Sequence, residues 1–126
     1  MLGKADATPM IAVKDLDRAR EFYEQTLGLE AAEDFGEGFA VKSGDTEFSV
    51  YRSEFAGTNK ATALTFEVDD IEGEVRQLKA KGIFFEHYDL PGLKQEGDLH
   101  VADGFKAAWF KDPDGNILSL AEGSGS

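Results

Sequence analysis

The chain alternates between two hydrophobic periods, and the same succession of periods occurs twice. The stretch that begins at Met10 and ends at Asp15 predicts a strand, and the apolar residues that follow at helical spacing predict a helix: Leu16, Ala19, Phe22, Tyr23 and Leu27. A second alternating stretch, Thr65–Ile71, runs in the same way into residues 72–81. This repeat predicts that the protein is built from two copies of one structural unit.

Polar and small residues mark where each predicted helix begins and ends. Asp15 and Asp70 follow the strands, where a carboxylate can accept hydrogen bonds from the free N–H groups of a helix N-terminus. Gly28 and Gly82 come after similar intervals, and glycine readily adopts the left-handed conformation that ends a helix. Gly73 lowers the propensity of the second helix without preventing it.

Three shorter strands are predicted after each helix, separated by glycine-rich turns. They are Glu30–Phe35, Phe39–Ser43 and Thr46–Arg52 in the first copy, and Ile83–Tyr88, Lys106–Lys111 and Asn116–Ala121 in the second. Residues 89–104 form the longest irregular segment. Pro113 and Gly115 predict a tight turn before the last strand, because proline fixes φ and glycine accepts a positive φ.

The expected fold class is therefore α+β, with tandem β-α-β-β-β modules over about residues 7–55 and 61–122. We expect one domain over residues 1–126, in which a curved, mostly antiparallel sheet surrounds a cleft and the helices lie on its outer face. The Gly-Ser-Gly-Ser sequence of residues 123–126 predicts a flexible tail.

Alternation along the predicted strands divides their side chains between two faces. One face is almost uniformly apolar and is predicted to lie beneath the helices: Ile11, Val13, Phe48, Val50, Leu64, Phe66, Val68, Ala108, Phe110, Leu118 and Leu120. The opposite face, called the mixed face below, combines small, hydroxyl-bearing, aromatic and charged residues: Thr8, Met10, Ala12, Glu47, Ser49, Tyr51, Ala63, Thr65, Glu67, Ala107, Trp109, Lys111, Ile117, Ser119 and Ala121.

Two interpretations fit the mixed face. Met10, Tyr51, Trp109 and Ile117 are unusual on a fully hydrated surface, and small residues beside aromatic and polar groups are typical of ligand cavities. A protein–protein surface has a similar composition. We favour the cavity, and the two interpretations combine if the cavity lies at a dimer interface.

Composition narrows the classes of partner. The 126 residues, 41% of them hydrophobic, suit one globular domain. Thirteen basic against 25 acidic residues give a formal net charge of −12, which disfavours nucleic acid and anionic membrane surfaces. This charge would attract a cationic molecule, but its contribution to solubility is the favoured explanation. Cysteine is absent, which excludes thiolate chemistry and disulfides. With no apolar run long enough to span a membrane, we expect a cytoplasmic protein.

Three motifs carry a family resemblance. They are Val13-Lys14-Asp15-Leu16 with Phe22-Tyr23 and Leu27-Gly28, then Phe66-Glu67-Val68-Asp69-Asp70, and finally Phe110-Lys111-Asp112-Pro113-Asp114-Gly115-Asn116. In this order they resemble the vicinal oxygen chelate superfamily, which groups glyoxalase I, extradiol dioxygenases and bleomycin-resistance proteins. The resemblance extends from about Thr8 to Ala121 and implies paired modules whose strands curl around a cleft.

The resemblance also locates the positions where metal-using members carry their ligands, in the first and last strand of each module. Counted from the motifs, these positions are Thr8, Ser49, Ala63 and Ser119. Alanine has no donor atom, and neutral hydroxyls are weak ligands for first-row metals. We therefore expect no metal and no cofactor. Pro9 in the first strand is similar to the metal-free bleomycin-resistance branch, whose members sequester a drug at a homodimer interface.

Candidate binding residues are taken from the mixed face and the aromatic residues near it. They are Thr8, Met10, Phe35, Phe39, Ser49, Tyr51, Ala63, Thr65, Trp109 and Ser119. Phe35 and Phe39 fit the core equally well. Glu47, Glu67 and His100 are candidates for acid–base chemistry, with a hydrated surface position as the alternative for each.

These observations favour a metal-independent, homodimeric protein that binds a small aromatic or cationic molecule and resembles drug-sequestering bleomycin-resistance proteins. One alternative is a glyoxalase- or dioxygenase-like lyase or isomerase with a non-standard site. The other is a ligand-free dimeric interaction module whose mixed face is wholly a protein surface.

Overall fold

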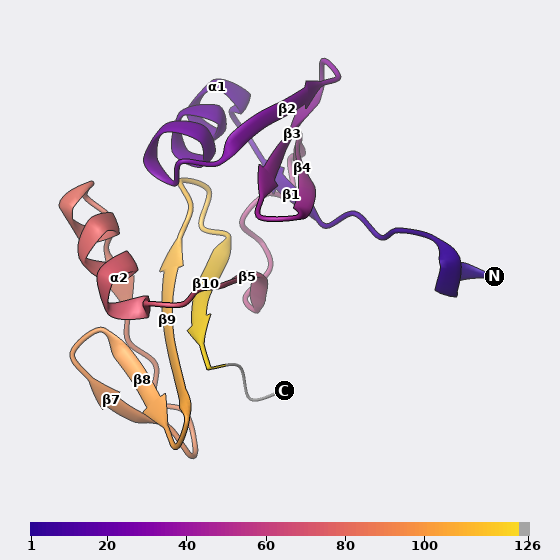
Figure 1. Cartoon of the computed structure of the whole chain (residues 1–126). Coiled ribbons are helices and arrows are strands. Elements are labelled where there is room, and N and C mark those ends of the chain that lie inside the picture. Colours follow the sequence, from indigo (N-terminus) through magenta and orange to yellow (C-terminus); the bar gives the residue numbers. More distant parts are fainter. Residues whose placement is uncertain (124–126) are drawn as a thin grey trace. The chain divides into compact units, whose positions relative to one another are not determined.

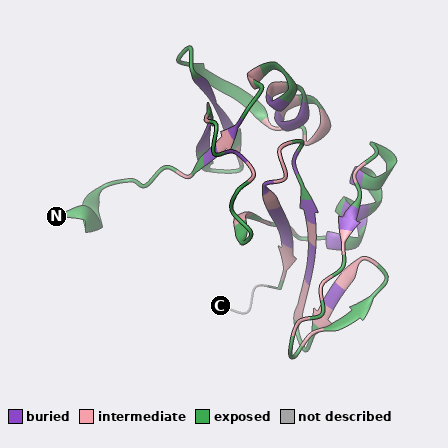
Figure 2. Cartoon of the chain, turned by 180° about the vertical axis from the view of Figure 1, so that it is seen from behind, coloured by how far each residue is buried: buried purple, intermediate pink, exposed green. Residues whose placement is uncertain are grey.

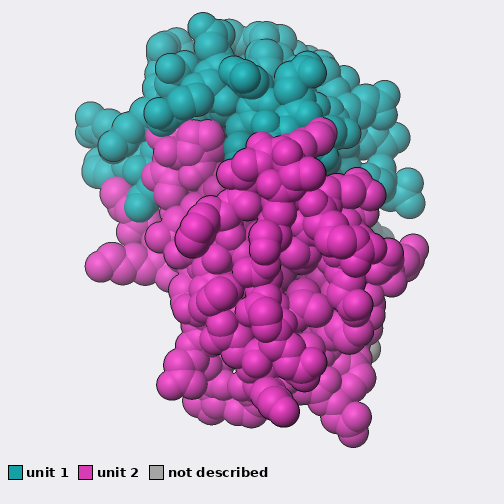
Figure 3. All heavy atoms as spheres, turned by 90° about the vertical axis from the view of Figure 1, so that its left-hand side faces the viewer, with its two compact units in different colours: residues 1–57 teal, residues 58–126 magenta. Residues whose placement is uncertain are grey.

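The computed structural model describes residues 1–123 and contains two compact units, Met1–Gly57 and Thr58–Ser126 (Figure 3). In each unit a β-sheet carries a helix on one face (Figure 1). Residues 124–126, which make up most of the predicted tail, lie outside the described residues.

The first unit contains a four-stranded sheet with the order β1-β4-β3-β2. Its elements are η1 (Leu2–Lys4), β1 (Met10–Val13), α1 (Leu16–Arg20), η2 (Glu21–Thr26), β2 (Glu30–Asp34), β3 (Gly38–Ser43) and β4 (Thr46–Arg52). β1 runs parallel to β4, and the other neighbours are antiparallel. The π-helix η2 continues α1, so the predicted first helix is formed by two consecutive helical segments.

The second unit repeats this order and adds a hairpin. Its elements are β5 (Thr62–Glu67), α2 (Ile71–Ala80), β6 (Phe85–Glu86), β7 (Lys94–Glu96), β8 (Leu99–Ala102), β9 (Phe105–Lys111) and β10 (Ile117–Glu122). The strand order is β5-β10-β9-β8-β7, and β6 also pairs with β9. Here too the first and last strands of the module, β5 and β10, are parallel.

The α+β class and the tandem modules are confirmed, and the strands lie in two mixed sheets of four and six strands. One detail of the prediction is wrong. The segment predicted to be irregular, residues 89–104, contains the β7–β8 hairpin, in which Gly97 has a φ of +64°. The sequence pattern missed this hairpin because β7 consists of Lys-Gln-Glu and has no apolar alternation.

The predicted helix signals act as expected. Asp15 accepts hydrogen bonds from two backbone N–H groups of the first helical turn, and Asp70 accepts one from Gly73 at 3.1 Å. Gly28 and Gly82 follow the helices with φ values of +75° and +92°. Both helices therefore begin at a carboxylate cap and end at a left-handed glycine.

The buried residues of each unit lie mainly on its strands and its helix (Figure 2), and alternation along the strands places them on the face beneath the helix. In the first unit the ring of Tyr23 on η2 packs edge-to-face against Phe48 on β4, with centroids 6.0 Å apart. In the second, α2 contacts β9 and β10 and buries Ile71, Val75 and Leu78. The predicted apolar face is confirmed, except that Leu64, Phe66 and Val68 on or beside the edge strand β5 are half-buried.

Gly73 has a structural role that its low helix propensity conceals. A Cβ atom at this position would lie 2.4 Å from Oδ2 of Asp70, the carboxylate that caps α2. An alanine side chain would therefore displace the carboxylate from its capping position.

We predict that Gly73→Ala stabilises the protein more in an Asp70→Ala background than in the wild type. Alanine gains about 1 kcal/mol of helix propensity, while loss of the cap costs about 1 kcal/mol, so the two effects offset each other only when the cap is present. Urea unfolding of the four proteins in a double-mutant cycle measures the difference. Equal effects of the alanine in both backgrounds would show that the methyl group and the cap do not compete.

Candidate functional site

A row of laterally paired residues crosses the mixed face of the second unit. Thr65 of β5 lies opposite Ser119 of β10, Ser119 lies opposite Trp109 of β9, and Trp109 lies opposite Glu86 of β6. Paired residues on neighbouring strands project from the same face of a sheet. The observed register therefore confirms the predicted composition of this face and adds Glu86 to it.

Hydrogen bonds connect the polar side chains of this row. The hydroxyl groups of Thr65 and Ser119 are 2.6 Å apart, and Ser119 is buried with 4% of its surface exposed. The indole N–H of Trp109 donates to Oγ1 of Thr62 over 3.0 Å. Because Thr62 belongs to β5 and Trp109 to β9, the indole extends across the intervening strand β10.

Two further aromatic rings, those of His100 and Tyr88, lie around Trp109 of this row. His100 of β8 lies opposite Ala107 of β9, which places it on the same face as Trp109. The His100 and Trp109 rings meet edge-to-face with centroids 4.9 Å apart, and Tyr88 lies 5.6 Å from Trp109 and 6.2 Å from His100. Burial, followed by the nearby Glu86 carboxylate, raises the pKa of the Tyr88 hydroxyl, which therefore stays protonated at neutral pH.

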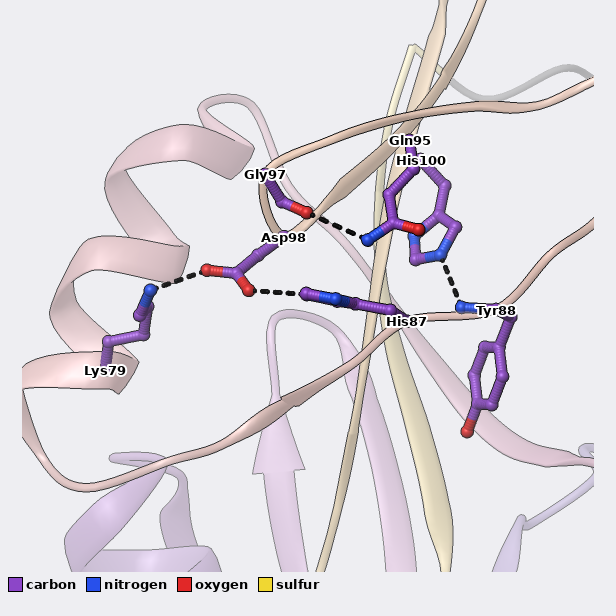
Figure 4. A network of polar contacts seen from close by, with 7 residues as sticks. All are labelled: Lys79, His87, Tyr88, Gln95, Gly97, Asp98 and His100. Carbon is purple, nitrogen blue, oxygen red and sulfur yellow. Dashed lines mark hydrogen bonds and ion pairs between the residues drawn. The ribbon is translucent and has the colours of Figure 1, made fainter.

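His100 is the most deeply buried titratable side chain of this group, with 1% of its surface exposed. Its Nε2 accepts the backbone N–H of Tyr88 over 2.9 Å (Figure 4). Its Nδ1 has no hydrogen-bond partner among the residues that the structure describes. A backbone N–H can only donate, so Nε2 must be unprotonated, which rules out action as a base at that atom without breaking this bond.

A polar network joins the β7–β8 hairpin to helix α2 (Figure 4). Asp98, in the turn of the hairpin, accepts from Lys79 of α2 over 2.7 Å and from His87 over 2.9 Å. The hydrogen bonds from Lys79 and then from His87 lower the pKa of the Asp98 carboxyl below its ordinary value. The network therefore holds the hairpin that carries His100.

The mixed face of the first unit is simpler. Ser49 of β4 is buried between Met10 of β1 and Ala40 of β3, while Met10 exposes 53% of its surface. The ring of Phe35 occupies the space that a side chain at Gly38 would fill, since a Cβ there would lie 2.7 Å from the ring.

The structure brings only some of the predicted binding residues together. Thr65, Trp109 and Ser119 form one contiguous row, and in the first unit Met10, Ser49 and Tyr51 share the mixed face. Thr8 is exposed and precedes β1. Ala63 has no partner residue on β10, because the register shifts there from the Thr62–Ile117 pair to the Leu64–Leu118 pair.

The remaining aromatic candidates have different environments. Phe39 has no exposed surface and lies opposite Val50 on the core face, with the Arg20 guanidinium 4.3 Å from its ring centre. Phe39 is therefore a core residue and cannot contact a ligand, because its strand register turns it inward. Phe35 is 48% exposed and remains a candidate.

Among the acid–base candidates, only His100 is buried. Glu47 and Glu67 are exposed, opposite Lys42 and Ala121 respectively. The predicted surface alternative for His100 does not describe its position, because β8 turns its ring toward Ala107 and Trp109.

Comparison with known proteins agrees with this architecture. The model of the Glyoxalase/Bleomycin resistance protein/Dioxygenase superfamily matches residues 7–120. The chain belongs to this superfamily.

Among individual relatives, the protein YetH of Bacillus subtilis (strain 168), which carries no assigned function, is 26% identical over 94% of this chain and 98% of its own. A glyoxalase family protein from Enterococcus faecalis is similar in structure, with a TM-score of 0.73 and 24% identity over 97% of this chain and 100% of its own. The fosfomycin resistance protein FosX from Listeria monocytogenes has a TM-score of 0.74 at 13% identity, covering 97% of this chain and 95% of its own. The two structures show a shared fold.

The residues at the superfamily's metal-ligand positions do not fit a divalent metal. Ala63 lacks a donor atom, and the Ser119 hydroxyl is engaged with Thr65 at 2.6 Å. Within residues 1–123, no three histidine, cysteine or carboxylate side chains are grouped closely enough to hold a metal ion. In the same part of the chain, no helix is long and apolar enough to cross a membrane.

Sequence reasoning missed Tyr88 and Glu86 as members of the mixed face. Both lie within the predicted strand 83–88, and every second residue of that strand projects from the same face. If the pairing of β6 with β9 had been known, Glu86 would have been placed opposite Trp109 and Tyr88 two residues further on the same face. The register of that pair depends on contacts between residues distant in sequence, so the pattern alone did not give it.

We predict that Asp98 contributes stability that depends on pH. Its folded-state pKa is lowered, so the contribution is present above its unfolded pKa of about 3.9 and is lost as pH falls through the folded value. Urea unfolding should show Asp98→Asn less stable than wild type at about pH 6, with the gap closing as the pH falls below about 4. Asp103→Asn, in an exposed turn, serves as the control. A gap that does not change with pH would contradict this role.

Proposed function

We propose that this protein binds a small organic molecule on the mixed face of its second unit, without a catalytic divalent metal. The observation that carries the proposal is the replacement of ligating side chains by Thr8, Ser49, Ala63 and Ser119. At Ser119 the hydroxyl also has a structural role, because it is hydrogen-bonded to Thr65. This chemistry is that of a site built to hold a molecule, as in drug-sequestering bleomycin-resistance proteins.

The composition of the mixed face in the second unit supports the proposal. Trp109 is half-buried and offers a large aromatic surface. Ala107 and Ser119 beside it have small side chains that project little from the sheet. Sites for small molecules combine such apolar and aromatic surface with a few polar groups that fix orientation. The net charge of −12 favours a cationic or neutral ligand over an anionic one.

The acid–base residues give less support to an enzyme. Glu47 and Glu67 are exposed to solvent, and Nε2 of His100 is occupied by the Tyr88 N–H. We therefore place binding ahead of turnover. A homodimer and a cytoplasmic location stay predictions.

Trp109 is the only tryptophan of the chain, so its fluorescence reports on this face alone. We predict that a thermal-shift screen of glycopeptide and aromatic antibiotics finds a ligand that also changes this fluorescence. At about 100 times Kd such a ligand adds about 2.7 kcal/mol of stability, and EDTA leaves the shift unchanged. Trp109→Phe should weaken binding about tenfold, because it removes aromatic area and the Thr62 hydrogen bond.

Phe55→Leu is the matched control, since Phe55 is an aromatic residue that is 69% exposed and lies in a turn after β4, outside any strand. It should bind like wild type. Binding that requires added zinc or manganese, or that is equal in wild type and Trp109→Phe, would contradict the proposal.

A further inference from the structure

We propose that the Nδ1–H group of His100 donates a hydrogen bond to the carbonyl oxygen of a flat, uncharged ligand held beside Trp109 and Tyr88. The inference rests on the proposed function, because it names the ligand class for the same face. It is carried by the surroundings of one buried side chain.

The hydrogen-bonding partner of Nε2 fixes the protonation of the ring. The Tyr88 backbone N–H points at Nε2 over 2.9 Å, so this nitrogen supplies the lone pair. A neutral imidazole carries its single proton on the other nitrogen. His100 is therefore the Nδ1–H tautomer, and its Nδ1 is a donor.

That donor lacks an acceptor. His100 is 1% exposed, and no described residue accepts a hydrogen bond from Nδ1. Buried polar groups are almost always paired in native proteins, and contact with an aromatic ring is a weak replacement for an acceptor. The missing acceptor is consistent with a site that is completed by a ligand.

The rings around His100 define the shape of the ligand. The interplanar angle is 86° between the rings of Trp109 and His100, and 74° between those of Trp109 and Tyr88. Rings set at steep angles present both faces and edges, against which a flat molecule can stack or pack edge-on.

The nearby charges define its polarity. Glu86 lies opposite Trp109 on the same face, and the cations of this region are already ion-paired, Lys111 with Glu86 and Lys79 with Asp98. An anionic acceptor would therefore find neither Lys111 nor Lys79 unpaired to balance its charge. A neutral carbonyl oxygen satisfies the Nδ1–H group and needs no such cation.

Access to Nδ1 requires movement of the residues that cover it. Tyr88 follows the end of β6 and lies in residues 87–93, which belong to no strand. Rotation of the Tyr88 side chain leaves its backbone N–H bonded to Nε2, and His100 is held within the β7–β8–β9 ladder.

Coumarin and naphthalene test the proposal as matched probes, because both are flat fused bicycles and only coumarin has a carbonyl oxygen. Binding is followed by NMR through the indole N–H signal of Trp109, which is unique in this chain. The proposal expects wild type to bind coumarin at least about tenfold more tightly than naphthalene. The Nδ1–H proton signal of His100 should move downfield with coumarin and not with naphthalene.

Two substitutions separate the nitrogens of His100. His100→Gln keeps an acceptor near the Nε2 position for the Tyr88 N–H and removes the Nδ1 donor, so it should bind coumarin no better than naphthalene. His100→Asn keeps a donor near the Nδ1 position and should retain most of the preference. Thermal unfolding shows whether each variant is folded. If a variant does not fold, the shift of the wild-type His100 Nδ1–H signal with coumarin still tests the proposal.

Equal binding of the two probes by wild type, no binding of coumarin at millimolar concentration, or an unchanged preference in His100→Gln would overturn the inference. These results are distinct from failure of the proposed function. A ligand from the antibiotic screen that binds wild type and His100→Gln equally would leave metal-free binding intact and remove His100 from it.

Discussion

Burial of one sheet face beneath a helix is the constraint on which both units depend. Side chains alternate along a strand, so fixing Val13, Phe48 and Val50 beneath α1 and η2 also fixes which residues face the other way. The same holds in the second unit, where Phe110 and Leu118 lie beneath α2. A shift of one residue in either sheet would bury the mixed face and expose the core.

The mixed face of the second unit follows from this register. Its central row contains a hydroxyl pair, Thr65 and Ser119, beside the indole of Trp109. The two hydroxyl groups join neighbouring strands by their hydrogen bond, and neutral hydroxyls are weak ligands for a metal ion. The aromatic surface beside them is suited to an organic molecule, and His100 adds a directed polar group to it.

The fold could be predicted from the sequence because its signals are local. Asp15 and Asp70 cap helices within their own turn, and alternation assigns the faces of β4 and β9 without knowledge of their neighbours. Phe39 could not be assigned in this way, because glycine residues before it left the register of β3 open and only pairing with Val50 shows that it faces the core.

The part of the site that the sequence did not reveal lies around His100. Its position depends on the β7–β8 hairpin, whose short polar first strand has no hydrophobic pattern. The hairpin is held by tertiary contacts, chiefly the ion pair of Asp98 with Lys79 on α2 and the pairing of β8 with β9. A histidine in a polar segment therefore looks like a surface residue until those contacts bury it.

Metal binding at equilibrium tests the central claim most directly. The protein is dialysed against zinc, manganese, nickel or ferrous iron under anaerobic conditions, and the metal bound per chain is measured by elemental analysis with a Ser119→His, Ala63→His variant as the positive comparison. Far less than one equivalent of any metal is expected on the wild type, and a gain is expected on the variant. One tightly held equivalent on the wild type would contradict the claim.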